Sequence, residues 1–342
     1  MINNEKFSIE TQIDDEEWLA FIQKCPQKDI FQTPHMKIVF EKTKDYDPFC
    51  FFARDEKDEI IASLLAYTIR EPVPFSYFSR RAIAEGGPLF LENEEGRLAA
   101  RLLIEEFSKK IKKHAIFAEI RNHRSSEEIN SIFQQSKFNF VDHLNIIIDL
   151  TKGKEALWND MHKQRRAGIR RSLRRGVSCK VVKSESDIKV LYDILKETYK
   201  YVKVPFADES LFIAIFQELV PKNFAKPFLL QLDDCPIASF VPLMYEGKII
   251  EFYTGGLREY SRYHANELAV WKLLEWGSEN NFNVFDFFGA GPPDKNYGVR
   301  DFKLRFGGEL VNNGRYLRIL HPISNKISKY GYKTWKILKK IF

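Results

Sequence analysis

The segment GVRDFKLRFGGEL, residues 298–310, contains the residue whose type and spacing best suit chemistry. Lys303 lies between Phe302 and Phe306, and two apolar anchors can hold a lysine side chain near a cleft. An ammonium group held in this way stabilises a developing oxyanion or binds a phosphate. The alternative is a surface lysine on an amphipathic turn, and this segment taken alone favours that alternative.

Two further segments precede this lysine. Residues 251–256, EFYTGG, place Tyr253 at the end of a predicted strand, just before a glycine turn. The helix predicted after that turn has His264 and Asn266 in its first turn. The sequence FDFFGAG, residues 285–291, then predicts a strand that runs into a loop.

Residues 161–175 contain seven basic residues and no acidic one. In a helix, Lys163, Arg166, Arg170 and Arg174 fall three or four residues apart on one face. Like charges at that spacing repel by roughly a few tenths of a kcal/mol per pair, so the pattern favours a bound anion. Phosphate is the first candidate because guanidinium groups bind it in a bidentate manner. The alternatives are a solvated helix face and a chance resemblance to a nuclear-localisation signal.

Composition sets limits on the class of protein. The 342 residues predict two domains, and 44% hydrophobic with 29% charged residues is typical of folded chains. The net charge of +6 favours polyanionic partners. Four isolated cysteines and seven histidines without ligand spacing predict no metal site. Together with a polar N-terminus they predict a cytoplasmic protein, and no run reaches the ~20 apolar residues of a transmembrane helix.

The elements that must position these residues follow one order twice. In the first half the patterns predict helices at 15–24, 36–42, 95–113 and 126–134 and strands at 48–54, 59–69, 115–121 and 144–150. Thr33 and Pro34 predict the N-cap and first turn of the second helix. In the second half they predict strands at 225–232, 236–245, 248–255 and 283–288 and a helix at 262–280.

The second half also repeats letters of the first. Ile61-Ala62-Ser63 matches Ile237-Ala238-Ser239, and the strand at Phe117 matches the strand at Phe285. We interpret this as a duplicated domain, with chance similarity of apolar strands as the alternative. The order of strand, strand, strand, helix, strand predicts α/β layers of the GNAT acyltransferase type, in two tandem copies with a ligand cleft between them. The glycine pair with which GNAT enzymes hold the pyrophosphate of coenzyme A is missing from residues 256–264.

At this point the sequence resembles the FemABX family of peptidyltransferases. Three blocks carry the resemblance: Leu157-Trp158 leading into Arg165-Arg166-x-x-Ile169-Arg170 and Gly176-Val177, then His264-Ala265-Asn266-Glu267-Leu268 with Trp271, and finally FDFFGAG followed by FKLRFGGEL. They cover most of residues 157–310. The first half matches mainly in its layout and in Phe31-Gln32-Thr33-Pro34.

The resemblance implies an enzyme that transfers an amino acid from aminoacyl-tRNA to an amine of a cell-wall precursor, linked to UDP or to a lipid, without a cofactor. It implies that Lys303 stabilises the oxyanion and that Tyr253 orients the acceptor. The implied substrate-binding residues are Lys37, Lys163, Arg166, Arg170, Tyr201, His264 and Asn266.

Two features depart from the family pattern. No heptad run predicts the coiled-coil arm of some members, and Tyr201 stands where the family has an arginine that helps to hold phosphates. The acceptor is therefore left open, as are the amino acid transferred and the oligomeric state.

The predicted domains are residues 1–150, residues 151–322, and a basic aromatic C-terminal helix at 323–342. That helix either lies on an anionic membrane surface, near a lipid-linked substrate, or packs by its apolar side. Two other functions stay open: an N-acyltransferase that uses an acyl-CoA or acyl carrier, and a non-catalytic RNA-binding protein.

Overall fold

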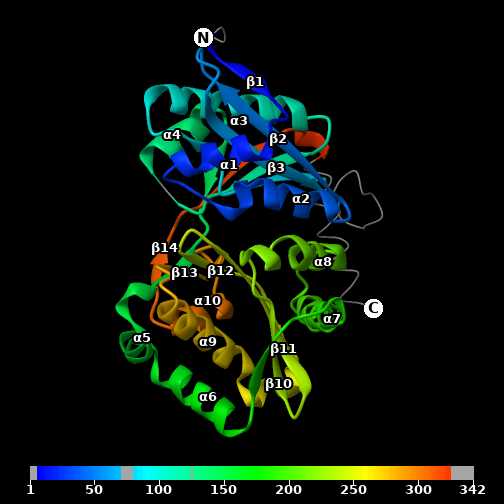
Figure 1. The fold of residues 1–342 in the computed structure, drawn as a ribbon, viewed down its shortest axis with the longest axis vertical. Coiled ribbons are helices and arrows are strands. Elements are labelled where there is room, and N and C mark those ends of the chain that lie inside the picture. The colour runs from blue at the N-terminus through cyan, green and yellow to red at the C-terminus, as the bar shows by residue number, and fades with distance from the viewer. Residues whose placement is uncertain (1–5, 71–79, 125, 325–342) are drawn as a thin grey trace. The chain divides into compact units, whose positions relative to one another are not determined.

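The structure is a computed structural model, which describes residues 6–70, 80–124 and 126–324. The chain forms two compact units, one of residues 1–141 and 313–342 and the other of residues 142–312. Each unit has one mixed β-sheet with helices packed on it (Figure 1). Of the predicted C-terminal helix, residues 325–342 lie outside the described part of the chain.

The first unit contains an eight-stranded sheet in the order β1-β2-β3-β4-β6-β15-β7, with β5 paired to β3. Its strands are β1 (Ser8–Glu10), β2 (Tyr46–Arg54), β3 (Ile60–Ile69), β4 (Arg81–Glu85), β5 (Leu89–Phe90), β6 (Phe117–Arg121), β7 (Asn139–Val141) and β15 (Arg315–Ile319). Its helices are α1 (Asp15–Lys24), α2 (Pro34–Lys42), α3 (Glu94–Ile111) and α4 (Glu127–Gln135).

Both faces of the first sheet are buried, as the unbroken apolar run of β3 predicts. Alternate side chains of β2 point to opposite faces. Phe52 packs edge-on against Trp18 of α1, with ring centroids 4.9 Å apart, whereas Phe51 packs against Phe107 of α3 at 6.2 Å. The predicted N-cap is confirmed, because the Thr33 hydroxyl accepts the amide hydrogen of Met36 at 3.2 Å.

The second unit contains a seven-stranded sheet in the order β14-β8-β13-β12-β11-β10-β9. Its strands are β8 (Asn145–Asp149), β9 (Ser178–Val181), β10 (Phe228–Leu232), β11 (Cys235–Tyr245), β12 (Lys248–Gly256), β13 (Val284–Asp286) and β14 (Glu309–Val311). Its helices are α5 (Lys154–Asp160), α6 (Lys163–Arg174), α7 (Glu185–Val202), α8 (Glu209–Glu218), α9 (Ala265–Glu279) and α10 (Gly298–Leu304), with a 3₁₀ helix, η6, at Arg258–Tyr263.

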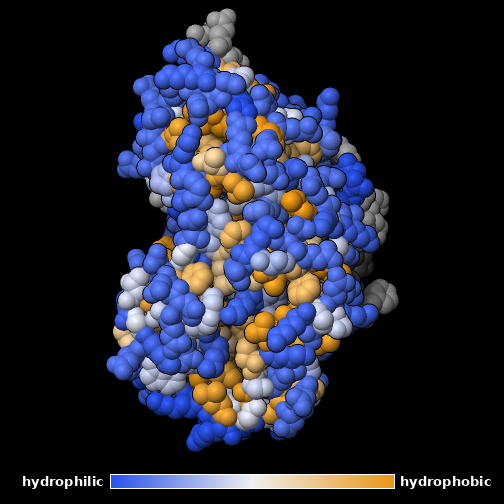
Figure 2. All heavy atoms as spheres, in the orientation of Figure 1, coloured by the Kyte–Doolittle hydropathy of each residue, from blue (hydrophilic) through white to orange (hydrophobic). Residues whose placement is uncertain are grey.

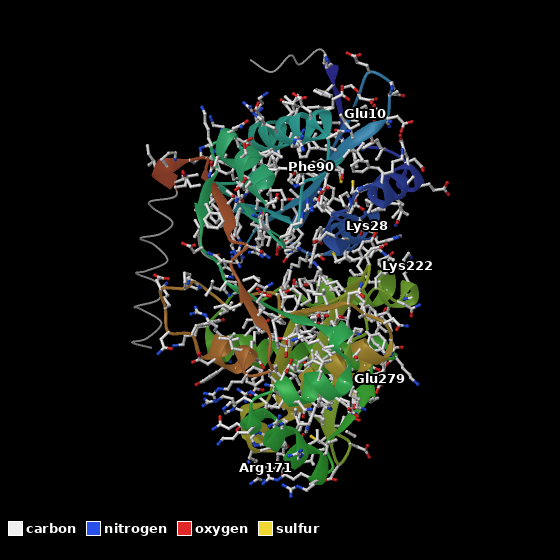
Figure 3. All side chains as sticks on the ribbon, turned by 90° about the vertical axis from the view of Figure 1, so that its left-hand side faces the viewer. Glu10, Lys28, Phe90, Arg171, Lys222 and Glu279 are labelled. Atoms are coloured by element: carbon white, nitrogen blue, oxygen red, sulfur yellow. The ribbon has the colours of Figure 1, made fainter. Side chains whose placement is uncertain are left out.

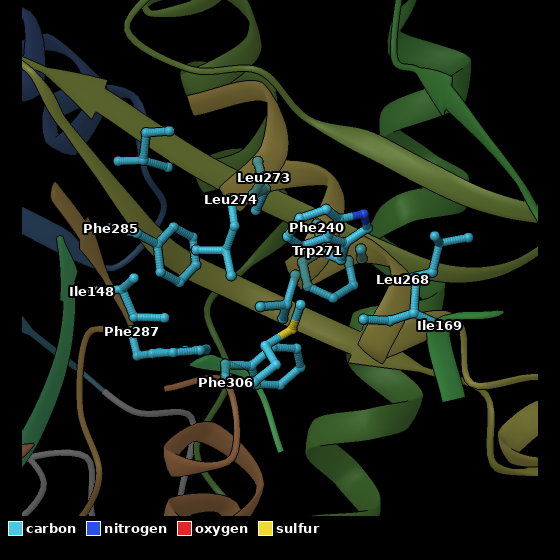
Figure 4. Packing of buried hydrophobic residues seen from close by; sticks show 14 of the residues in the cluster. Ile148, Ile169, Phe240, Leu268, Trp271, Leu273, Leu274, Phe285, Phe287 and Phe306 are labelled. Atoms are coloured by element: carbon cyan, nitrogen blue, oxygen red, sulfur yellow. The ribbon is translucent and has the colours of Figure 1, made fainter. Parts of the chain in front are cut away.

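The predicted duplication is visible in the two sheets. Strands β2-β3-β4 and β10-β11-β12 are antiparallel meanders, and a long helix, α3 or α9, then leads to a parallel partner, β6 or β13. The core of the second unit lies between α9 and this sheet, where Trp271 and Leu274 contact Phe240 and Phe285 (Figure 4). The predicted GNAT-like α/β class, in two tandem copies, is therefore correct.

The domain boundaries differ from those expected from the sequence. β8 follows β7 along the chain but pairs with β13, in the second sheet. β15 follows β14 but pairs with β6 and β7, in the first sheet. Each sheet is thus completed by a strand that a division at residues 150 and 322 assigns to the other domain. The division falls at 141/142 and 312/313 because strand pairing, not chain order, decides membership.

Candidate active site

Strand β12 of the second unit has an irregularity in its register at Phe252. Tyr253 lies opposite Val241, whereas Glu251 lies opposite Pro242, so Phe252 is the extra residue of a β-bulge. Pro242 has no amide hydrogen to donate, and a proline in a central strand is tolerated at such a bulge. A bulge bends its strand and re-aims the side chains beside it.

Immediately before the bulge, β12 separates from its parallel neighbour β13. The two strands pair only from Lys248–Val284 to Ile250–Asp286. Beyond Asp286 the chain turns, with positive φ at Phe288 (55°) and Gly289 (123°). Glu251 is therefore the first residue of β12 past the point of separation, and the polar groups described next lie around it.

Lys303 of α10 is buried at this point, with 8% of its surface exposed. Its Nζ donates hydrogen bonds to the carbonyl oxygens of Phe287 (2.6 Å) and Gly289 (3.0 Å) and lies 3.7 Å from Oε1 of Glu251. Phe306 is buried and Phe302 packs against the same core, so the predicted packing around the lysine is present. An ammonium group has three N–H donors. Two are used by carbonyl groups, and the third is left for the carboxylate or for a substrate oxygen.

The carboxyl group of Glu251 has a raised pKa because of its surroundings. It is buried, and its Oε2 has no hydrogen-bond partner among the described residues. Burial raises the pKa of Glu251 to about 7; the Lys303 ammonium opposes this rise and the Asp286 carboxylate adds to it. A carboxyl group with a pKa near neutrality can accept and release a proton under physiological conditions.

Asp286 and Asn145 fix the loop that faces these two residues. Asp286 Oδ1 accepts hydrogen bonds from Asn145 Nδ2 and from the Phe288 amide, both at 2.7 Å. Asn145 Oδ1 accepts the Gly289 amide hydrogen at 2.7 Å, and Arg300 of α10 donates to the Ala290 carbonyl at 2.9 Å. The loop that presents the two carbonyl groups to Lys303 is therefore fixed at Phe288, Gly289 and Ala290.

Tyr253 borders the same region through an aromatic cluster. Its ring lies 5.0 Å from Phe212, 5.6 Å from Tyr199 and 5.7 Å from Phe206, between centroids. Burial raises the pKa of Tyr199, and the Glu251 carboxylate adds to this rise. The cluster surrounds the far side of the bulge with apolar surface, which strengthens electrostatic interactions near Glu251 by lowering the local dielectric constant.

The predicted arginines of α6 are partly engaged within the unit. Arg166 donates to the carbonyl groups of Trp158 and Asn159 at 3.3 and 2.8 Å, so it caps the end of α5. The Arg170 guanidinium lies 5.2 Å from the Trp158 ring. Lys163 is exposed at the start of the helix. Whether these three residues bind substrate stays a prediction.

His264 and Asn266 pack the start of α9 against its surroundings. His264 Nδ1 lies 3.1 Å from Glu267 Oε1, and its Nε2 lies 3.0 Å from Arg171 Nη1. A Cβ on Gly256 would lie only 2.8 Å from Oδ1 of Asn266, so the glycine is required for this close approach. Both predicted residues therefore have a visible structural role.

Two other predicted residues make contacts with different partners. Tyr201 is exposed at the end of α7, with the Arg258 guanidinium 3.9 Å from its ring centroid. Lys37 belongs to the first unit, where it forms an ion pair with Glu41 at 2.9 Å that raises the pKa of the lysine.

Helix α6 nevertheless contacts α10, the helix that contains Lys303. The guanidinium of Arg165 lies 4.1 Å from the ring centroid of Phe302 and forms an ion pair with Glu267 at 3.1 Å. Arg305 donates to Gln164 at 2.7 Å. α6, α9 and α10 are therefore joined by polar contacts around the predicted catalytic lysine.

Sequence reasoning named Lys303 but missed Glu251, Asp286 and Asn145. The available signal was a carboxylate inside each of two apolar strands, since a charged group in such a run is costly unless it is paired. In the described part of the chain, no cluster of three or more His, Cys, Asp or Glu side chains is arranged to hold a metal ion. None of the described helices is long and apolar enough to cross a membrane.

Comparison with known proteins agrees with this geometry. Residues 161–303 match the family model of the acetyltransferase (GNAT) domain. The second unit is therefore similar to an acyltransferase domain of GNAT type. Among curated protein sequences, none matches this chain significantly.

Solved structures extend the likeness to both units. The crystal structure of FemX superposes with a TM-score of 0.69 at 14% identity, covering 94% of this chain and all (100%) of the other. A tandem GNAT protein from the clavulanic acid biosynthesis pathway gives 0.61 at 9% identity, with coverage of 93% and 99%. L-PGS from Bacillus licheniformis gives 0.57 at 15% identity, with coverage of 94% and 98%. The resemblance to Fem-type proteins stated from the sequence is confirmed in the tandem GNAT fold.

Proposed function

We propose that this chain is an aminoacyltransferase that joins an amino acid from aminoacyl-tRNA to an amine of a cell-wall precursor peptide or a similar acceptor. The observation that supports this most is the Lys303–Glu251 pair, 3.7 Å apart and buried where β12 and β13 separate. The fold shared with FemX supports a cell-wall acceptor, and the fold shared with L-PGS supports an acceptor other than a precursor peptide.

Each group of the pair has a distinct task. An acceptor amine arrives as an ammonium ion and must lose one proton before it attacks. Glu251, whose pKa is raised to about 7 by burial, takes that proton. The amine then attacks the ester carbonyl carbon, a C–N bond forms, and the carbonyl electron pair moves to oxygen. The third N–H group of Lys303 stabilises this oxyanion.

Collapse of the intermediate completes the transfer. The carbonyl group re-forms and the C–O bond to the ribose of the tRNA breaks. The ribose oxygen takes the second proton that the attacking nitrogen loses, so the products are an amide and a free tRNA hydroxyl. Tyr253, two residues beyond Glu251, orients the acceptor chain against the aromatic cluster, and no cofactor takes part.

A reconstituted reaction tests this proposal. Purified protein, charged tRNA and a precursor peptide should give a product heavier by one aminoacyl residue, detected by mass spectrometry. Lys303→Met should lower the rate at least about 100-fold, the size typical for loss of an oxyanion donor. Lys295→Met is the matched control, because Lys295 is exposed on the loop that precedes α10. Normal turnover by Lys303→Met would exclude the proposed role of the lysine.

An acyl-CoA-dependent N-acyltransferase is the second candidate function. It is favoured by the match to an acetyltransferase family model and by the separation of β12 from β13. The segment between Gly256 and His264 argues against it. That segment forms the 3₁₀ helix η6 and contains no further glycine whose backbone could wrap a pyrophosphate. Saturable binding of coenzyme A in calorimetry would favour this second candidate.

A further inference from the structure

Helix α6 separates its cations into two groups. Ile169 and Ser172 are fully buried against the core, and Arg165 and Arg166 are half-buried in the contacts described above. The remaining cations of the segment lie on the exposed side of the helix: Lys163, Arg170, Arg171, Arg174 and Arg175. Arg171 lies on the outer side of α6, where nitrogen-tipped side chains gather (Figure 3). In Figure 2 the lower edge of this unit is hydrophilic, with apolar atoms beside it.

Neighbouring groups hold two of these guanidinium groups in place. His264 holds Arg171 at 3.0 Å and is itself held by Glu267. Arg175 donates to the Arg262 carbonyl at 2.5 Å. A solvated charge run needs no such supports. Arginines fixed in advance lose less conformational entropy when they bind a ligand.

Arg175 of the α6 segment and Arg262 of η6 both lie near one aromatic ring. The guanidinium groups of Arg175 and Arg262 lie 5.4 and 5.0 Å from the ring centroid of Tyr263. Bringing like charges together is unfavourable unless an anion accompanies them. Glu267 is already paired with Arg165, and the exposed Glu259 of η6 does not balance the five exposed cations of α6. We will call these five cations together with Arg262 the α6 face.

The chemistry of the α6 face fits a phosphate backbone better than a bilayer. A helix that lies on a membrane turns its apolar side outward, into the lipid. In α6 the apolar side faces the core through Ile169, and Leu173 is the large apolar residue exposed on the helix, at 48%. The exposed side offers rigid bidentate donors, which suit phosphate oxygens.

We propose that the α6 face is the docking surface for the sugar–phosphate backbone of a structured RNA. The choice of tRNA as that RNA rests on the proposed function. Contacts of this kind do not depend on base sequence, and they place the RNA without reading it. The inner side of the same helix contacts the helix of the proposed catalytic lysine, because Arg165 of α6 packs on Phe302, the neighbour of Lys303.

The experiment measures binding of unfractionated, uncharged tRNA by filter retention over a range of salt concentrations. Arg171→Gln/Arg174→Gln/Arg175→Gln should weaken binding about 10-fold or more and reduce the slope of log K against log salt by about 2–3, as expected for three lost phosphate contacts. Lys163→Gln/Arg174→Gln leaves the supported arginines intact and should give a smaller loss in the same direction. The matched control, Lys110→Gln/Lys112→Gln/Lys113→Gln, removes three exposed cations from the first unit and should bind as the unchanged protein does.

Three results would overturn the inference. In the first, the triple arginine variant binds tRNA with unchanged affinity and salt slope. In the second, the lysine control loses as much affinity, which would mean that binding follows total charge. In the third, the triple arginine variant still binds tRNA but no longer binds vesicles of anionic phospholipid, which would assign the α6 face to a lipid surface.

The test also separates this inference from the proposed function. Lys303→Met should bind tRNA normally even though its rate of transfer falls at least about 100-fold. If transfer is never detected but the arginine variant alone loses tRNA binding, the docking surface stands and the aminoacyltransferase proposal fails.

Discussion

Replacing Glu251 by glutamine should make the protein more stable at neutral pH while impairing it as an enzyme. Burial raises the pKa of Glu251 from its ordinary value of 4.5 to about 7. The folded state therefore binds a proton more tightly than the unfolded chain, and folding stability falls as the pH rises from the lower value to the higher. That interval corresponds to a stability loss of about 3 kcal/mol, which is complete above pH 7. The uncharged amide introduced by Glu251→Gln does not titrate, so the variant would escape this loss.

Urea unfolding of both proteins at pH 5, 6, 7 and 8 measures the effect. The difference in unfolding free energy between variant and unchanged protein should grow with pH and level off above neutrality. Taking this difference cancels the titration of all other groups. Glu155→Gln, which changes an exposed carboxylate of α5, is the matched control and should show no such growth. A constant difference across the pH series would refute the argument that Glu251 is a buried, strained acid.

The other predictions concern the same unit. The acyl-transfer rate should rise with pH through about 7 as Glu251 ionises, and Glu251→Gln should lower it about 100-fold or more and remove this limb of the profile. Lys303→Met removes the cation that lies 3.7 Å from Glu251, an attraction of about 4 kcal/mol at an effective dielectric constant near 20. The rise of the residual rate with pH should therefore move upward by at least about one pH unit. An unmoved pH profile would show that Lys303 does not act on the ionisation of Glu251. Gly255→Ala places a Cβ 2.6 Å from Oγ1 of Thr198 and should lower stability by about 1–3 kcal/mol in thermal unfolding, with partial recovery in Gly255→Ala/Thr198→Ala; unchanged stability would contradict the close approach of α7 to β12.

Much of the fold follows from local pattern. The helix predicted at 15–24 has those bounds, and the strand predicted at 248–255 ends one residue later, at Gly256. Periodicity determines which face of an element is apolar, and capping residues such as Thr33 determine where a helix begins. The order of elements then identified two copies of one fold.

The position of Lys303 was also accessible from the sequence, because the aromatic residues Phe302 and Phe306 lie within three positions of it along the chain. The candidate active site as a whole was not. Glu251 meets Lys303 across 52 positions of sequence, and its raised pKa depends on burial that only the packed sheet provides. The bulge at Phe252, which turns this part of β12, depends on the register with β11.

The assignment of strands to sheets shows the same division. β8 matches the strand predicted at 144–150, whereas no strand was predicted at β15, whose sequence RYLRI contains two arginines. Their hydrogen bonds to β13 and to β6 place each in the sheet that chain order does not suggest. The sequence by itself determined the longer strands and helices of both units, the residue types that they present, and the basic character of α6. The tertiary structure alone decided which strands pair, which arginines turn inward, and which carboxylate lies beside the lysine, because these depend on contacts between residues far apart in the chain.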